Sequence, residues 1–253
     1  MVRIDVLDPK YQLSDQYKPD KEKQYKHPIE QDGWVIAHNA LRGEIQLLRD
    51  ALYAMKQRDQ SLQDWEVASL QSAIDGHILH MLGHHSNEDD IVVPECRKRF
   101  LYPEKLETDH EILVKKIETI KGIMLGLDVG SKVDNLLHEW IEYQDMMLPH
   151  LLEEEEVGLP LFRSYFEPKA AAKITQKIAR QASRLEMGSF VYFLGTEKFR
   201  SMFMKNEGIP DFVWFIMFKR SHKIFVQQFI TNVEALTSGT APTEPKCGSC
   251  NIL

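Results

Sequence analysis

Cysteine is scarce in this chain, basic residues are fewer than acidic ones, and long apolar runs are missing. The 253 residues include only three cysteines, Cys96, Cys247 and Cys250, which are too few for a disulfide framework. We therefore expect a reducing, intracellular compartment. Acidic residues outnumber lysine and arginine by 38 to 31 and no basic block is present, so nucleic acid is not an expected partner.

The apolar segments are too short to cross a membrane. The longest, FVWFIMF at residues 212–218, falls far below the ~20 residues that a membrane-spanning helix needs. The opening residues MVRIDVLDPK also lack the apolar core of a signal peptide, so a cytoplasmic location is expected. Hydrophobic residues still make up 43% of the chain, enough for one large domain or a domain with an appendage.

Apolar residues at helical spacing predict four long helices after a polar N-terminal arm over residues 1–31. The first begins at Asp32-Gly33, with Asp32 as the predicted N-cap. The others are expected over about 62–93, 106–125 and 132–157. Pro94 is expected to mark the end of the second helix, because proline interrupts the helical hydrogen-bond ladder.

The inward stripes of these helices repeat. A shift of 72 residues superimposes the first stripe on the third, and a shift of 66 superimposes the second on the fourth. The positions that coincide include His38 with His110, His84 with His150, and Glu88 with Glu154. We interpret the match as a duplicated helical hairpin. It predicts an all-α fold, an antiparallel up-down four-helix bundle over residues 32–166.

Two further segments follow the predicted bundle. Residues 167–236 are rich in helix formers and aromatic residues, which predicts a helical C-terminal extension packed as an extra layer on the bundle. A groove for an aromatic ligand or a lipid is the alternative interpretation. Residues 237–253 are rich in Ser, Thr, Pro and Gly and are expected to form a flexible tail.

Polar residues interrupt the inward faces of all four predicted helices. Each stripe contains one histidine, and a glutamate follows the second and the fourth histidine by one helical turn. These six residues are His38, His84, Glu88, His110, His150 and Glu154. A single inward histidine is usually a neutral core residue, but two buried carboxylates without partners would be very costly. A pair of divalent metal ions would satisfy the whole set, since imidazole and carboxylate suit iron, manganese or zinc.

The ordered set His, His-x3-Glu, His, His-x3-Glu resembles the hemerythrin-like (HHE cation-binding) family over about residues 32–166. The segments that carry the resemblance are GWVIAHNALRGEI, HHSNE, TDHEIL and HLLEE followed by LPLF. The resemblance implies a nonheme di-iron site with a bridging oxo or hydroxo group; manganese is the alternative metal. It further implies one iron on His38 and His84, the other on His110 and His150, and bridges from Glu88 and Glu154.

Two positions depart from the oxygen-carrying members of this family. Val114 stands four residues after His110, where those proteins have a further histidine. Glu154 stands four residues after His150, where they have an aspartate five residues on. The chain is similar instead to the more symmetric members implicated in iron sensing and nitrosative-stress repair. The small ligands that this resemblance implies are dioxygen, nitric oxide or peroxide, and it casts doubt on reversible oxygen carriage.

Three further histidines lie close to His84 in the sequence. His77 and His80 share a similar helix face with it, and we interpret them as supporting or access-path residues, with additional ligands as the alternative. His85 is expected to point away from the site, as a helical neighbour at i+1 does.

Three acidic residues surround Glu154, and they are expected to lie on a solvated face. A proton relay through the first or second of them is the alternative. They are Glu153, Glu155 and Glu156.

The cysteines receive separate interpretations. Cys96 is expected to be an inert buried thiol. The terminal residues Cys250-Asn251-Ile252-Leu253 fit a prenylation box, with Cys247 as a second, palmitoylated site, so attachment to a membrane surface is one expectation. A flexible tail and a reactive Cys-x-x-Cys pair are the alternatives.

Three functions remain open at the level of the sequence. The first is a di-iron protein that engages dioxygen or a related small molecule. The second is an iron-responsive interaction protein, in which metal stabilises the bundle and regulates partner binding through the aromatic-rich extension. The third is a metal-free helical adaptor. The sequence assigns neither a reaction nor a protein partner.

Overall fold

The computed structural model describes residues 4–14, 16–20 and 25–242 of the chain. Within these ranges the regular secondary structure is helical, apart from one isolated antiparallel bridge between Gln12 and Phe100. The prediction of an all-helical protein is therefore confirmed for the described residues.

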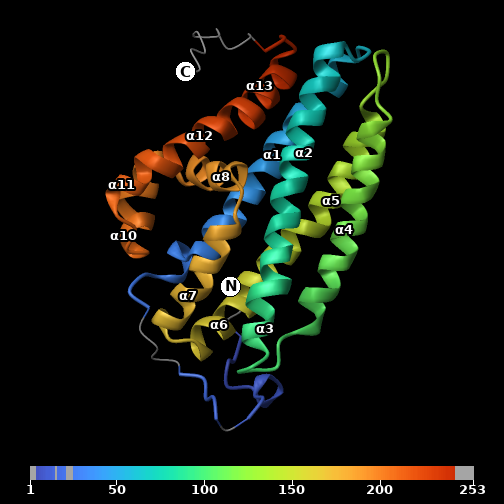
Figure 1. Cartoon of the computed structure of the whole chain (residues 1–253). Coiled ribbons are helices and arrows are strands. Elements are labelled where there is room, and N and C mark those ends of the chain that lie inside the picture. Colours follow the sequence, from blue (N-terminus) through green and yellow to red (C-terminus); the bar gives the residue numbers. More distant parts are fainter. Residues whose placement is uncertain (1–3, 15, 21–24, 243–253) are drawn as a thin grey trace.

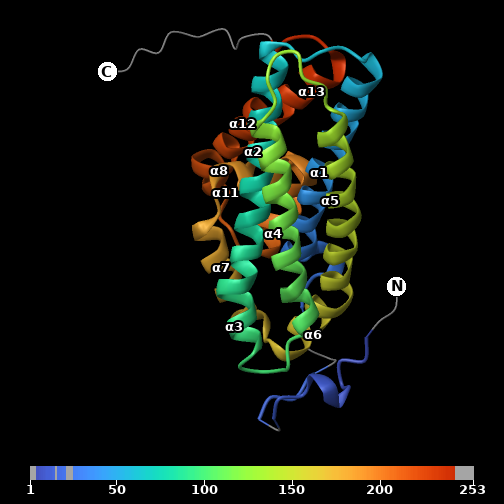
Figure 2. The same cartoon turned by 90° about the vertical axis from the view of Figure 1, so that its right-hand side faces the viewer.

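Four long helical runs lie side by side, with their axes roughly aligned in both views (Figures 1 and 2). The first is α1 (Gly33–Arg58), and the third is α4 (Glu104–Leu125). The second run joins α2 (Asp64–Asn87), η3 (Glu88–Val92) and α3 (Val93–Cys96). The fourth joins α5 (Asp134–Glu153), η4 (Glu154–Gly158) and α6 (Leu159–Tyr165).

Local caps explain where the first two runs begin. The Asp32 side chain accepts a hydrogen bond from the Trp34 amide, so the predicted N-cap is present. Gln63 and Glu66 form a reciprocal capping box at the start of α2. These contacts satisfy amide groups that have no partner within the helix, and they therefore define both starts.

Both glutamate-bearing runs widen into a π-helical turn at the glutamate. The turn η3 starts at Glu88 and η4 starts at Glu154, so the sequence repeat extends to the backbone. Such turns occur frequently at functional sites, but three more lie at residues 199–203, 214–218 and 226–230, so the turn alone does not mark a site. The prediction that Pro94 ends the second helix is wrong, because the helix continues to Cys96. The missing N–H of Pro94 costs little directly after a turn that already interrupts the regular ladder.

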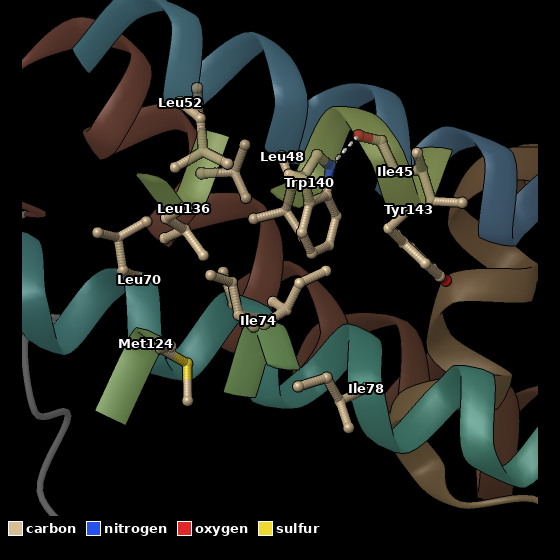
Figure 3. Packing of buried hydrophobic residues seen from close by; sticks show 14 of the residues in the cluster. Ile45, Leu48, Leu52, Leu70, Ile74, Ile78, Met124, Leu136, Trp140 and Tyr143 are labelled. Carbon is tan, nitrogen blue, oxygen red and sulfur yellow. Dashed lines mark hydrogen bonds between the residues drawn. The ribbon is translucent and has the colours of Figure 1, made fainter. Parts of the chain in front are cut away.

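One apolar cluster packs between the four long helices (Figure 3). Leu48, Ile74 and Leu136 are completely buried there, as is Trp140, whose indole Nε1 donates to the carbonyl of Ile45 at 3.1 Å. Burying one such aliphatic side chain contributes about 1.5–3 kcal/mol. This cluster stabilises the packing of the helices. Along the helices, the six predicted metal ligands lie between it and a second apolar cluster.

The residues after the four runs fold into a helical layer on one side of them (Figure 1). It begins with α7 (Pro168–Gln181) and α8 (Arg184–Leu194), followed by the short segments α9 (Thr196–Lys198), η5 (Phe199–Phe203) and α10 (Met204–Asn206). A continuous helical run then comprises α11 (Asp211–Val213), η6 (Trp214–Phe218), α12 (Lys219–Phe225), η7 (Val226–Ile230) and α13 (Thr231–Ser238). Phe225, Phe229 and Leu236 join the core of the four long helices.

A glycine allows two helices of this layer to cross closely. A Cβ atom on Gly188 of α8 would lie 2.2 Å from the Ser221 carbonyl oxygen and 2.6 Å from Cβ of Phe225. Only a residue without a side chain fits at this crossing of α8 with α12. The crossing fixes α8 against α12, which matters because α8 also contributes residues near the site described below.

The described part of the N-terminal segment is packed more closely than the sequence predicted. Val6 and Tyr11 are buried in a second apolar cluster with Phe100 and Phe166. The Leu101 amide also donates to the Tyr11 carbonyl oxygen at 2.9 Å. The expectation of an arm outside the packed elements is therefore wrong for these residues, because their apolar side chains cover one end of the helices.

None of the helices in the described ranges combines the length and the apolar character needed to span a bilayer. The predicted lipidation residues Cys247 and Cys250 lie outside the described residues.

Candidate metal centre

The six predicted ligands come together between the four long helices. His38 projects from α1 and His84 from α2, while Glu88 and Glu154 open the two π turns. Donor atoms of these four residues lie within 4.8 Å of one another. His110 from α4 and His150 from α5 join His85 in a second, adjacent group with the same spacing. The arrangement has two neighbouring positions, each large enough for one ion.

The two carboxylates face both positions. Glu154 directs Oε2 toward His38 Nε2 at 3.3 Å and Oε1 toward the Nε2 atoms of His110 and His150, each at 3.5 Å. Glu88 approaches His84 Nε2 at 3.4 Å and His110 Nε2 at 3.5 Å. Each glutamate thus has oxygens near the histidines of both groups, which is the placement that a bridging carboxylate requires.

These donor atoms are buried and unpaired. His38 and Glu154 are completely buried, and Glu88, His110 and His150 are at most 3% exposed. Within the described part of the chain, no hydrogen-bond partner exists for the Nε2 atoms of the four predicted histidine ligands or for either carboxylate oxygen of the two glutamates. Unpaired buried polar atoms are rare because each costs about 1–3 kcal/mol, and more when charged. The donor set therefore fits divalent cations.

His85 contradicts the sequence-based expectation. It does not point away: the side chain is 3% exposed, and its ring stacks on that of His110 with the centroids 4.1 Å apart. Both of its ring nitrogens are buried without a hydrogen-bond partner among the described residues. His84 and His85 face two different neighbouring helices, since consecutive helical residues point about 100° apart.

Carboxylates outside the six residues orient two of the histidines. His38 Nδ1 lies 2.9 Å from Glu155 Oε1, which also accepts from Arg42 at 2.6 Å. His110 Nδ1 lies 2.8 Å from Asp89 Oδ1. Hydrogen bonds of this kind fix the ring of a metal-binding histidine and leave Nε2 free for the ion.

The solvated-face expectation is therefore wrong for Glu155, which contacts His38 and Arg42. It holds for Glu153, which is more exposed and pairs with Lys105. Asp89 was missed by the sequence analysis. Its position directly after Glu88 was the available signal, matching Glu155 directly after Glu154.

Burial and neighbouring charges shift the pKa values of several donor residues. Burial, and then the charge of Glu154, raises the pKa of Glu88 to about 7. Burial, and then the surrounding imidazoles, lowers the pKa of His84 and His85 well below the usual range. For His38, burial opposes the charged ring, but contacts with Glu155 and Glu88 outweigh it and raise the pKa to about 9. A bound cation would take the place of these protons.

His77 and His80 have partners other than the candidate metal positions. Their Nδ1 atoms lie 2.7 and 2.8 Å from the two carboxylate oxygens of Glu44. Ser189 of α8 donates to the same carboxylate, and His77 Nε2 lies 2.8 Å from the Tyr143 hydroxyl. This network supports the interpretation of both histidines as supporting residues. Glu44 was missed by the sequence analysis, although it lies between the buried residues Leu41 and Ile45 of α1.

A buried cysteine and a surface group of metal-ligating residue types lie outside this centre. Cys96 is completely buried, and burial raises the pKa of its thiol far above the usual range, so it is not a thiolate donor. His138, Glu139 and Glu142 form a third close group on the surface, but Lys116 binds both of its carboxylates.

Helices that bring buried imidazoles and carboxylates together around two adjacent positions define a helical cation-binding protein. A comparison with protein families identifies the class: the hemerythrin HHE cation binding domain matches residues 31–162, more than half of the chain. The chain belongs to this family, and the resemblance drawn from the sequence is confirmed. Comparisons with curated proteins and with solved structures gave no significant match.

Proposed function

We propose that this protein is a nonheme di-iron protein that engages dioxygen, nitric oxide or a peroxide. One observation supports the proposal above others: six predicted ligands from four helices converge with their metal-facing atoms buried and unpaired within the described residues. The family match adds cation binding. Iron fits a mixed imidazole and carboxylate donor set, and manganese would fit the same set.

The proposed ligands divide between two metal positions. The first position takes His38 and His84, and the second takes His110 and His150. Glu88 and Glu154 bridge the positions, together with an oxo or hydroxo group. The duplicated hairpin, in an antiparallel up-down bundle, accounts for the approximate symmetry of this assignment.

We add His85 to the second position. Its burial, its two unpaired ring nitrogens and its closeness to His110 and His150 support this addition. The second position then has three histidines and the first has two. The first position therefore has fewer protein donors, and we assign to it the coordination site that a small ligand enters.

Bound iron at this site would supply the capacity to bind and reduce a small oxygen- or nitrogen-containing ligand. The chain's own contribution is to hold the imidazoles through Glu155 and Asp89, to exclude bulk water by burial, and to keep unpaired donors in place before the metal arrives. Such preorganisation reduces the free-energy cost of forming the site.

Metal analysis tests the proposal. Protein purified with ferrous salt should contain two irons per chain and absorb in the near ultraviolet as an oxo-bridged ferric pair does. The Glu88→Ala, Glu154→Ala double variant should lose both properties. Reduction should bleach the absorption, and oxygen should restore it. A wild-type chain with less than one iron, or a double variant that keeps both, contradicts the proposal.

A second function, the iron-responsive interaction protein, is favoured by one feature of the helical layer. Phe212, Phe215 and Ile216 are 62%, 62% and 72% exposed on adjacent turns of α11 and η6. Exposed apolar groups of this size are common at protein interfaces. For this function, amide hydrogen exchange over residues 211–218 should change when iron is removed. Unchanged exchange would leave the small-ligand function as the better explanation.

A further inference from the structure

A pocket of about 180 Å³ adjoins the candidate metal centre. Of the six predicted ligands, only His84 and Glu88 line it. His85, His110 and His150, the histidines of the second position, do not. The pocket therefore meets the first position, which has fewer protein donors.

The helical layer closes this pocket over the four long helices. Trp34 and Phe162 form the wall on the side of the long helices, and Ile178, Met187 and Phe203 form the wall contributed by the layer. These walls are apolar. The space therefore exists because the extension covers the site, and the four long helices alone would leave this side open.

We infer that this pocket binds an uncharged organic molecule with one aromatic ring, or an apolar body of that size, and a single polar group directed at His84 and Glu88. The binding site follows from the pocket itself. Its position next to a metal ion rests on the function proposed above.

The size of the pocket favours an organic molecule over a diatomic gas. An apolar cavity of about 150 Å³ accommodates benzene, whereas one water molecule occupies about 30 Å³ of liquid. A volume of about 180 Å³ therefore admits a ring with a short substituent and far exceeds the needs of dioxygen.

The charges around the pocket disfavour anions. Asp32, Glu88 and Glu186 contribute carboxylates to the lining, and no lysine or arginine among the described residues does. Arg163 pairs with Asp32 at 3.2 Å but does not line the pocket. Before a metal ion binds, an anionic ligand would approach like charges along largely apolar walls, which is costly. His80 and Asn87 offer hydrogen bonds to an uncharged polar group.

Glu186 of α8 makes a close contact with α2 at the rim of the pocket. A Cβ atom on Gly83 would lie 2.1 Å from Oε1 of Glu186, so a larger residue at position 83 would displace this carboxylate. Glu186 also caps α8 through Ser183. This contact fixes the rim of the pocket beside His84.

Calorimetric titration of the full chain without added metal, using benzyl alcohol as the ligand, tests the inference, with benzoate as the charged control of similar shape. We expect one saturable site for benzyl alcohol and at least tenfold weaker binding of benzoate. Two variants narrow the pocket from opposite walls, Ala37→Leu on α1 and Ala179→Leu on α7. Each should weaken benzyl alcohol binding at least tenfold, while Ala172→Leu, on α7 outside the pocket lining, should not.

Proximity to the metal is tested with the same probe. Protein loaded with manganese should accelerate the proton relaxation of benzyl alcohol, and protein loaded with diamagnetic zinc should not. The acceleration should be lost in Ala37→Leu and Ala179→Leu.

Three results would contradict the proposed binding site. They are no saturable benzyl alcohol binding, equal binding of benzoate, or unchanged benzyl alcohol binding in both narrowing variants. Iron content, measured after ferrous salt is added to the same samples, separates the two proposals. Two irons without benzyl alcohol binding refutes the pocket alone, and benzyl alcohol binding without iron uptake refutes the di-iron function alone.

Discussion

His77 Nδ1 lies 2.7 Å from Oε2 of Glu44, in the interior of the protein where both side chains are buried. Because a carboxylate only accepts, the ring donates from Nδ1, and its Nε2 lies 2.8 Å from the Tyr143 hydroxyl. The second carboxylate oxygen pairs with His80 at 2.8 Å. Glu44 therefore holds two histidines of α2 and, through Ser189, ties the helical layer to α1.

Replacing this carboxylate should destabilise the fold. Glu44→Gln presents an amide N–H group to histidine donors and leaves buried groups unpaired, so we expect a loss of about 3 kcal/mol in the free energy of unfolding. Urea unfolding at pH 7 measures the loss. Glu118→Gln, at an exposed position of α4, should change stability by less than about 0.5 kcal/mol. Equal effects of the two substitutions would show that the Glu44 network contributes little.

The pKa of Glu44 predicts that the stability of the fold depends on pH. Burial opposes its ionisation, but the charge of His80 and the hydrogen bonds from both histidines outweigh burial and lower the pKa of Glu44 to about 2, from 4.5 in the unfolded chain. A lowered pKa stabilises the fold above pH 4.5, and this contribution is lost as the pH falls from 4.5 toward 2. The stability difference between wild type and Glu44→Gln should therefore narrow on acidification. A difference that widens below pH 4.5 would reverse the assigned sign.

The raised pKa of His80 predicts how the stability of the fold changes as the pH rises. Burial opposes its charge, but Glu44 outweighs burial and raises the pKa of the imidazole. The stabilisation that the protonated ring supplies is complete below the unfolded-state pKa and is lost as the pH rises through the raised pKa. Nuclear magnetic resonance titration of the His80 ring measures this directly. The raised pKa should return toward its ordinary value in Glu44→Gln, and an unchanged titration would contradict the pairing.

Removing His85 should weaken metal binding at one position only. If this imidazole is the third histidine of the second position, His85→Ala should retain the ion held by His38 and His84 and lose affinity for the other. We expect an iron content near one per chain after competition with a chelator. His222→Ala, in α12 away from the site, should retain two. If His85→Ala binds two irons as tightly as wild type does, His85 is not a metal ligand.

Asp89, which pairs with His110, should affect the affinity for metal without binding the metal itself. Loss of a carboxylate that orients a metal-bound histidine typically weakens binding about 10–100-fold. We expect this range for Asp89→Asn in chelator competition. The adjacent Asp90→Asn is the matched control, because Asp90 is exposed and bonds only to Ser86 in the described contacts. Equal affinities for the two variants would exclude the supporting role of Asp89.

The sequence predicted the helices and the six convergent residues because both depend on local periodicity. Helical spacing places a histidine and a glutamate four residues apart on one face, and the repeat doubles that signal. Periodicity does not say which helices share an ion, so the pairing of His38 with His84 came from the family resemblance alone.

The missed features depend on contacts between distant segments. Glu44 is satisfied by His77 on another helix and by Ser189 in the extension, and nothing near Glu44 in the sequence reveals either partner. His85 was misplaced because the i+1 rule assumes one inward face, whereas α2 has neighbours on several sides. The π turns at Glu88 and Glu154 changed the expected role of Pro94, and no propensity signals such a turn.

An anomalous difference map at the iron absorption edge, from crystals of the iron-loaded full chain, tests the dinuclear centre most directly. We expect two peaks, one beside His38 and His84 and the other among His85, His110 and His150, with Glu88 and Glu154 between them. An absent peak at both positions, or iron bound elsewhere on the chain, would contradict the assignment of this centre.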